Sequence, residues 1–572
     1  MNRLFPAFST ATKPTLLHWD INSISKPLRW VGIALSIWLL PTVGTMRPAL
    51  GAERIYFSYG ALEDSVSIAS LAKYAKTGKI DENLADYTKR LNRRQLTQLR
   101  RVLLTRVDLS PIAVSQFFYS PIGETLLERL GELIQTPARL SGFYSIRGAL
   151  ILAAADSQGL TLLNVMQKFP TRGIWLDLAR ILQTTGALER LNNQTNRAVA
   201  LVSQQSAAQA TTQPPVDFSR LPDIQQRGQF TWSKQALTLY DSRHSNKFLA
   251  DIYLPRLLNA RAPVIIISYG LGEDRHSFEY LAQQLASYGF AVGVPENAGS
   301  DAKQVRALLA GHANQVAEPS EFISRALNVK FLLDELQRRS QSDPAFKLNL
   351  QQVGVIGQSL GGYAALALAG APLNFKQLQK NCKTLDNTLN LSLILQCRVL
   401  ELLPIQYNLR DRRIKAAIAI NPIDSSVFGQ ASLSKIQVPV MIVSGSADTI
   451  APALLEQIRP FTWLTTPEKY LAVIQGGTHF STIGQAKAGS SFLAIPSQAI
   501  GPDPTIARRY VKALSLAFFQ TYILGSSQYR PYLSASYAKA ISQAPLDLSI
   551  VQFLTENQLA QAINSSNKTA KK

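Results

Sequence analysis

The segment that most constrains this chain is Val353–Ala369, with the sequence VGVIGQSLGGYAALALA. A β-branched apolar run reaches the motif GQSLG at residues 357–361 and continues as an alanine- and leucine-rich run, which is typical of a strand that turns into a helix. A serine on so sharp a turn is strained, so the positions two before and two after it must lack side chains. Gly357 and Gly361 fill them around Ser359. The pattern predicts a Gly-x-Ser-x-Gly nucleophile elbow, and the alternative is a glycine turn that serves only packing.

The rest of the second half alternates short apolar runs with helical or long looping segments. The runs are Val264–Ile267, Phe290–Val294, Val353–Ile356, Ala416–Ile420, Val438–Val443 and Tyr470–Ile474. Three strand-like segments precede them, at Gln229–Trp232, Ala236–Tyr240 and Phe248–Tyr253, and predict an antiparallel start. The sequence therefore predicts an α/β fold, a mostly parallel sheet with helices on both faces.

Two of these runs end in residues that suit chemistry with Ser359. Asp448 follows the run Val438–Val443, and His479 follows Tyr470–Ile474 after two glycines. Because ligand-handling residues gather at the carboxyl ends of parallel strands, we expect all three side chains at one edge of the sheet. The chain order Ser, Asp, His is that of an α/β-hydrolase triad. In it the serine is the nucleophile, the histidine the general base, and the aspartate orients the imidazole.

The acid and the oxyanion hole each have an alternative. Asp424 follows the preceding strand in NPID and is the alternative acid. An oxyanion needs two N–H donors, which we assign to Leu360 and to Leu271 in the loop SYGLG, with Gly270 as the alternative to Leu271. The alternative interpretation of this loop is a glycine turn that forms no oxyanion hole and serves only to let two backbone segments approach closely. Three other histidines lie outside the N-terminal segment: His244, His276 and His312. Unlike His479, none of them comes after a predicted core strand and two glycines.

The stretch SYGLGEDRHSFEYLAQQLASYGFAV, followed by GQSLGG, resembles the platelet-activating-factor acetylhydrolase and dienelactone hydrolase branches of the α/β-hydrolases. In those branches the first loop commonly reads His-Gly-Leu-Gly, so Tyr269 is a departure. The acetylhydrolase acid follows the strand after the elbow, where this chain has Asn421, and the acid here is expected one strand later, as in dienelactone hydrolases. The whole mature chain, including AERIYFSYGALEDSVSI, looks like a cyanobacterial family of exported α/β-hydrolases with an N-terminal domain of unknown function. The resemblance implies hydrolase chemistry, but it does not indicate which substrate is cleaved.

Residues 1–52 are predicted to be a signal peptide. Basic residues lead into the apolar run Trp30–Leu40, and the small-residue site Leu50–Ala52 follows. The apolar run is short for a bilayer span, so we expect export with cleavage, to the periplasm, thylakoid lumen or outside. An uncleaved membrane anchor is the alternative.

Four further regions follow the signal. Residues 53–202 are predicted to be mainly helical, and residues 203–216, which are small, polar and proline-terminated, to be a flexible linker. Residues 217–525 form the predicted hydrolase domain, and residues 526–572 a C-terminal extension. The predicted N-terminal helices are Asp81–Leu91, Arg94–Val107, Ala113–Phe118, Gly123–Ile134, Ser145–Ala155 and Thr161–Phe169.

An insertion at residues 373–413 carries the only cysteines, Cys382 and Cys397. After export they would form a disulfide, whereas in the cytosol they would stay free thiols. They lack the His and Cys neighbours of a zinc site. The insertion is rich in Leu and Ile, and so it would either cap the serine as an apolar lid, favouring acyl chains, or simply pack on the sheet.

The net charge of the chain indicates one class of binding partner, anionic surfaces. The 572 residues carry 59 Lys and Arg against 38 Asp and Glu, a net charge of +21, which attracts anionic surfaces such as membranes. No nucleic-acid-binding motif is present. The sequence predicts a serine hydrolase of carboxylic, lipid-like esters that needs no metal or organic cofactor, and it leaves the oligomeric state open. The alternatives are an amide or peptide hydrolase, a non-catalytic binding module on the same fold, and a structural protein of the membrane surface.

Overall fold

The computed structural model describes residues 51–59, 62–89, 91–241, 246–258, 260–485 and 497–565. Of the predicted signal peptide, only residues 51 and 52 are among the described residues. His244 lies outside them. No helix in the described ranges is long and apolar enough to cross a bilayer.

The N-terminal part is helical, as predicted, but it also contains a small sheet. Its helices are α2 (Ile68–Thr77), α3 (Glu82–Thr88), α4 (Arg93–Leu104), α5 (Pro111–Phe118), α6 (Pro121–Leu133), α7 (Phe143–Ala155) and α8 (Leu162–Gln167). The strands run in the order β2-β1-β4-β3 and are β1 (Arg54–Tyr59), β2 (Leu62–Ser67), β3 (Ile134–Gln135) and β4 (Gly173–Leu176). None of these strands was predicted; β3 and β4 are too short to show an alternating pattern, and β2 is largely polar.

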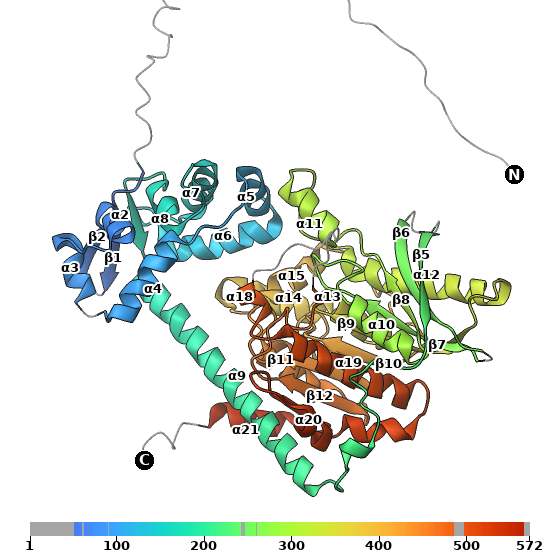
Figure 1. The fold of residues 1–572 in the computed structure, drawn as a ribbon. Coiled ribbons are helices and arrows are strands. Elements are labelled where there is room, and N and C mark those ends of the chain that lie inside the picture. The colour runs from blue at the N-terminus through green and yellow to red at the C-terminus, as the bar shows by residue number, and fades with distance from the viewer. Residues whose placement is uncertain are drawn as a thin grey trace, which may run out of the picture. The chain divides into compact units, whose positions relative to one another are not determined.

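Helix α9 (Leu178–Thr212) corrects the predicted flexible linker at residues 203–216. Its 35 residues run through the small polar stretch without a break, since that stretch holds no glycine and no proline before Pro214. The helix also has a packed face here: Val202 is fully buried, and the Ser206 hydroxyl accepts the Ile550 N–H at 3.1 Å. Figure 1 shows α9 beside α20 (Ala535–Ile541) and α21 (Glu556–Asn564). Tertiary packing therefore continues the helix where composition suggested a linker.

The second part is built on one large sheet (Figure 1). Within the described residues its strands run in the order β13-β12-β11-β10-β9-β7-β8-β6-β5. They are β5 (Trp232–Asp241), β6 (Asn246–Pro255), β7 (Ala262–Ser268), β8 (Ala291–Pro295), β9 (Leu348–Gln358), β10 (Ile414–Ile420), β11 (Val440–Gly445), β12 (Lys469–Ile474) and β13 (Leu548–Val551). The pairs from β8 to β12 are parallel, while β5, β6 and β13 pair antiparallel at the two edges.

Two expectations for this sheet need correction at its edges. The segments Gln229–Trp232 and Ala236–Tyr240 are not two strands, because a single strand, β5, begins at Trp232. Strand β13 lies inside residues 526–572, which the sequence suggested were only an extension, and it pairs with β12. The remaining predicted strands are confirmed within a few residues at each end.

Helices cover both faces of the sheet and enclose two apolar cores. One core packs α12 (Glu321–Ser342) and α13 (Leu360–Ala369) against the sheet. The other packs α10 (Glu279–Ser287) and α19 (Pro504–Tyr522) against the opposite face, with α10 and α19 in front of the strands in Figure 1. The predicted α/β fold is confirmed.

The insertion after α13 folds into short helices closed by a disulfide. They are α14 (Phe375–Asn381), η3 (Cys382–Asn387), α15 (Ser392–Cys397) and η4 (Arg398–Glu401). Cys382 and Cys397 are bonded to each other in a disulfide. Other helical segments are η2 (Phe218–Arg220), α11 (Ala302–Leu309), α16 (Gly429–Leu433), the π-helical turn η5 (Leu454–Ile458), α17 (Arg459–Trp463), α18 (Ser497–Ile500) and η6 (Ser527–Leu533).

Candidate active site

Ser359 sits on a sharp turn between β9 and α13. Its backbone has φ 55° and ψ −120°, a combination that costs energy for any residue other than glycine. A Cβ on Gly357 would meet the Gly361 carbonyl oxygen at 2.1 Å, and one on Gly361 would meet the Ser268 carbonyl oxygen at 2.0 Å. The two glycines are therefore required by contact between strand, turn and helix, as the sequence predicted.

The position of this turn in the sheet suits a ligand site. The chain passes from β7 to β8 on one side and then returns to place β9 on the other side of β7. At such a reversal the loops after the two strands separate and leave a crevice at their carboxyl ends. Ser359 follows β9 and Leu271 follows β7, so both lie at this crevice.

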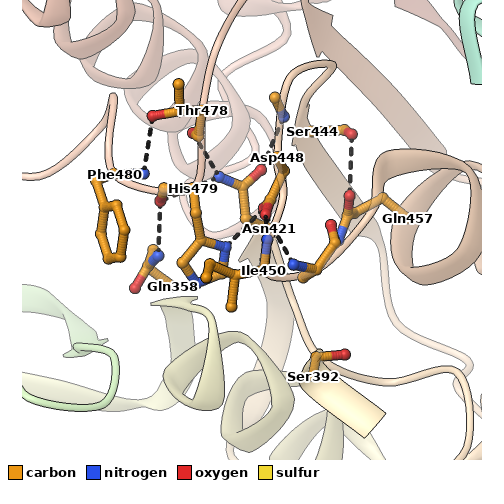
Figure 2. A network of polar contacts seen from close by, with 12 residues as sticks. Gln358, Ser392, Asn421, Ser444, Asp448, Ile450, Gln457, Thr478, His479 and Phe480 are labelled. Carbon is orange, nitrogen blue, oxygen red and sulfur yellow. Dashed lines mark hydrogen bonds and ion pairs between the residues drawn. The ribbon is translucent and has the colours of Figure 1, made fainter. Parts of the chain in front are cut away.

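The structure brings Asp448 and His479 together. The imidazole Nδ1 lies 2.6 Å from the Asp448 Oδ2, and both residues are buried. The other carboxylate oxygen, Oδ1, accepts the backbone N–H groups of Ile450 and Ala451 at 2.8 and 2.7 Å. These bonds fix the carboxylate in one orientation toward the imidazole, as Figure 2 shows.

Asp424, the alternative acid, has a different environment. Its two carboxylate oxygens are buried and, within the described residues, have no hydrogen-bond partner. Burial raises its pKa well above the ordinary value, and the nearby Glu456 carboxylate raises it further. Glu456 itself accepts hydrogen bonds from the Asn390, Gln396 and Ser425 side chains and from the Asp424 and Ser425 N–H groups. The structure thus pairs His479 with Asp448 and leaves Asp424 outside the pair.

Polar side chains connect the histidine loop to the elbow. The Gln358 Nε2, adjacent to Ser359, donates to the His479 carbonyl at 3.0 Å. Asn421 Nδ2 donates to the carbonyl groups of Thr478 and His479 at 3.2 and 3.3 Å, as seen in Figure 2. The Ser359 N–H donates to the Ile420 carbonyl at 2.9 Å. The ends of β9, β10 and β12 are therefore held together around the serine.

Sequence reasoning noted Asn421 only as a departure from the resembled family and missed this bridging role. Its Oδ1 accepts the Gly445 N–H at 2.8 Å, which adds the end of β11 to the same network. A polar amide directly after a buried strand was the signal that could have indicated it.

The two expected oxyanion donors are available in the structure. Within the part of the chain that the structure describes, no hydrogen bond uses the N–H of Leu360 or Leu271. The N–H of the alternative, Gly270, is engaged by the Glu273 Oε2 at 3.1 Å. Tyr269 is buried, and its hydroxyl accepts the Asn297 N–H at 2.8 Å. The tyrosine that replaces the histidine of the resembled families therefore binds the loop after β8.

Two buried charged residues near this loop were not expected from the sequence. Arg325 has no exposed surface and donates to the carbonyl groups of Tyr269 and Gly270. Burial raises the pKa of Glu273 to about 7, although the Gly270 N–H, His479 and Arg325 all act to lower it. Neither residue belongs to a short motif, and only their burial reveals them.

Comparison with known families gives a match to the N-terminal part of the chain. Residues 51–177 match a family model described as "Alpha/beta hydrolase of unknown function (DUF1400)". The matched segment is the N-terminal helical part with its small sheet. A comparison with curated proteins finds no match to the chain. The match supports the α/β-hydrolase superfamily, in agreement with the fold, and it distinguishes neither the acetylhydrolase nor the dienelactone hydrolase branch.

The class that fold and match together indicate is a hydrolase on an α/β-hydrolase fold. Within the described ranges, no group of three or more His, Cys, Asp and Glu side chains is arranged to hold a metal ion.

Proposed function

We propose that the protein is a serine hydrolase that cleaves carboxylic esters, with Ser359 as nucleophile. The observation that carries the proposal is the buried pair of Asp448 and His479, whose loop is hydrogen-bonded to Gln358 beside the strained serine. A nucleophile, a base and an orienting acid at the ends of neighbouring strands are what acyl transfer through a serine requires.

In the proposed reaction His479 first carries its proton on Nδ1, and this N–H donates a hydrogen bond to the Asp448 carboxylate. Nε2 is then unprotonated and can act as the base. Nε2 takes the Ser359 hydroxyl proton as the oxygen attacks the ester carbonyl carbon. The N–H groups of Leu360 and Leu271 stabilise the negative oxygen that forms. The intermediate expels the alcohol, which receives the proton from Nε2, and an acyl-enzyme remains. Water then gives a proton to Nε2 as its oxygen attacks the acyl carbon. The bond from this carbon to the Ser359 oxygen breaks, the serine oxygen takes the proton back from Nε2, and the acid is released.

A lipid-like substrate is the class that the insertion supports. The Ser392 N–H at the start of α15 donates to the Ile450 carbonyl at 2.9 Å, which holds the insertion against the loop of Asp448. The same insertion exposes large apolar side chains: Leu391, Leu403 and Ile405. Apolar surface on a segment that is hydrogen-bonded to the Asp448 loop favours acyl chains over polar substrates.

The proposal includes export, with residues 1–52 as a cleaved signal. It also includes association of the mature protein with anionic membrane surfaces, since 54 Lys and Arg against 37 Asp and Glu leave a net charge of +17 after cleavage. The mass of the mature N-terminal peptide from a host with a secretion system tests cleavage. Loss of liposome binding at raised salt tests the electrostatic association.

The test of the activity uses protein that begins at residue 53. A fluorophosphonate probe is expected to label Ser359, as found by peptide mapping, and Ser359→Ala should abolish both labelling and turnover of p-nitrophenyl esters. Ser324→Ala, on the first turn of α12 at a half-buried position, is the matched control and should behave as wild type. Turnover across acyl lengths from acetyl to palmitoyl defines the substrate class. Folded protein with no labelling and no turnover would refute the proposal and favour a binding module, and cleavage of anilides but not esters would favour an amidase.

A further inference from the structure

We propose that Arg325 and Glu273 are positioning residues that together aim the Leu271 N–H at the reacting carbonyl. The inference rests on the proposed ester hydrolysis, and it assigns to two buried charged side chains the orientation of one peptide unit.

Arg325 directs its guanidinium onto the loop after β7. It projects from α12 with no exposed surface, and its Nη1 donates to the Tyr269 carbonyl. Its Nη2 donates to the Ser300 hydroxyl at 2.7 Å and, more weakly, to the Gly270 carbonyl at 3.4 Å. Glu321 Oε2 lies 3.6 Å from Nε and provides the countercharge. Two of these three hydrogen bonds of the buried cation thus go to one loop.

These contacts determine where the N–H groups of the loop point. In a trans peptide unit the C=O and the following N–H point in opposite directions. Arg325 holds the carbonyl groups of Tyr269 and Gly270 on its own side, so the N–H groups of Gly270 and Leu271 point away from it. Leu271 N–H is the one of the two that is not engaged within the described residues.

Glu273 holds the loop from the opposite side. Its Oε2 accepts the Gly270 N–H at 3.1 Å, and its own carbonyl accepts the Ala302 N–H at 2.8 Å. The Gly272 N–H donates to the Ser300 carbonyl at 2.8 Å. A Cβ on Gly270 would lie 2.8 Å from the Glu273 Oε1 and 2.3 Å from the Gln358 Oε1, so the two side chains are on the same side of the loop. Since Gln358 precedes Ser359 and donates to the His479 carbonyl, this is the side of the candidate active site.

The loop is also in close contact with the elbow. A Cβ on Gly361 would lie 2.0 Å from the Ser268 carbonyl oxygen and 2.7 Å from that of Tyr269. A Cβ on Gly270 would lie 2.3 Å from the Gln358 Oε1. A rotation of the Gly270–Leu271 peptide unit would therefore act directly at the serine, where small displacements of a donor lower the rate strongly.

A purely structural role explains these contacts less well. Burying a guanidinium is costly unless all of its groups are paired, and apolar residues of similar volume stabilise a core at least as well. Here the Arg325 Nε has no hydrogen-bond partner within the described residues. Nη1 donates to the Tyr269 carbonyl, and Nη2 donates to the Ser300 hydroxyl and to the Gly270 carbonyl. The arrangement is built around the carbonyl groups of the loop.

The experiment compares Arg325→Lys with wild type in the protein that begins at residue 53. Lysine keeps the charge for Glu321 but lacks the planar guanidinium that holds the two carbonyl groups in fixed directions. We expect kcat for a p-nitrophenyl ester to fall about 10- to 100-fold with KM little changed, less than the loss of a whole oxyanion donor costs. Arg413→Met is the matched control, because Arg413 also pairs with carboxylates and donates to a backbone carbonyl, that of Lys330. It should keep the wild-type kcat.

Two spectroscopic readouts do not depend on turnover. In protein labelled with [15N]leucine, the Leu271 amide signal, identified by its loss in Leu271→Met, should shift in Arg325→Lys. The downfield proton between His479 and Asp448 should stay in place, which shows that the rest of the site is intact. If Arg325→Lys does not fold, the double variant Glu321→Gln/Arg325→Met removes both charges together and is read in the same way.

The outcomes separate the two proposals. Normal kcat and an unmoved Leu271 signal in a folded variant would overturn the positioning role while leaving ester hydrolysis in place. A wild-type protein without labelling or turnover would overturn the proposed function, and the Leu271 signal would still decide whether Arg325 orients the loop.

Discussion

The carboxyl group of Glu273 should make the protein less stable as the pH rises from about 4.5 to about 7. Burial raises its pKa from 4.5 to about 7 in the folded protein, so between these values the native state holds a proton that the unfolded state has released. The free energy of unfolding therefore falls with rising pH in this window and levels off above it. A pKa difference of about 2.5, at about 1.4 kcal/mol per tenfold change, corresponds to about 3 kcal/mol.

The assay is urea unfolding of wild type and Glu273→Gln at pH values from 4.5 to 8. The amide does not titrate, so the variant should lose up to about 3 kcal/mol less than wild type over this range. The charged groups that act on Glu273 are His479, Arg325 and Asp274, and all three stay in the variant. Asp424 shifts in the same direction, which is why the difference between the two proteins is the quantity to compare.

Glu335→Gln provides a control of opposite sign. Arg338 and Arg339 lower the pKa of the Glu335 carboxyl, so its stabilisation is present above the unfolded-state pKa and is lost as the pH falls through the folded-state pKa. Parallel stability curves for wild type and Glu273→Gln between pH 4.5 and 7 would refute the buried-acid reasoning for Glu273.

The remaining predictions concern the acid and the disulfide. Asp448→Asn should lower kcat by about 10⁴-fold because the imidazole tautomer is no longer fixed, whereas Asp424→Asn should leave kcat unchanged; the reverse result in ester kinetics would reassign the acid. Cys382→Ser/Cys397→Ser should lower the free energy of unfolding by about 3 kcal/mol, the cost of opening a loop of about 15 residues. Equal urea midpoints for the wild type with and without reductant would contradict that prediction.

The sequence allowed the central sheet and the serine turn to be predicted because both follow from strong local rules. A strand buried on both faces must be a short apolar run, and a strained turn between strand and helix must be flanked by glycines. The grouping of Ser359, Asp448 and His479 at one edge needed only one further step, that parallel strands end on the same side.

The misses share a different cause, since each depends on contacts between distant parts of the chain. The polar stretch at residues 203–212 is helical because its small residues pack against β13 and its neighbours. Strand β13 lies in the segment that was predicted to be only a C-terminal extension, and it forms by pairing with the edge of β12. Arg325 lies 55 residues beyond Gly270, whose carbonyl it bonds. No periodicity or motif links such positions.

The position of the acid and the identity of Asn421 explain each other. The residue after β10 must serve the Gly445 N–H on one side and the carbonyl groups of Thr478 and His479 on the other. An amide does both, because its oxygen accepts and its NH₂ group donates, and asparagine tolerates the φ of 42° found here. A carboxylate would place negative charge against two carbonyl oxygens. Because the end of β10 bridges the loops as an amide, the orienting acid that we propose comes from the next strand, β11, which is followed by Asp448.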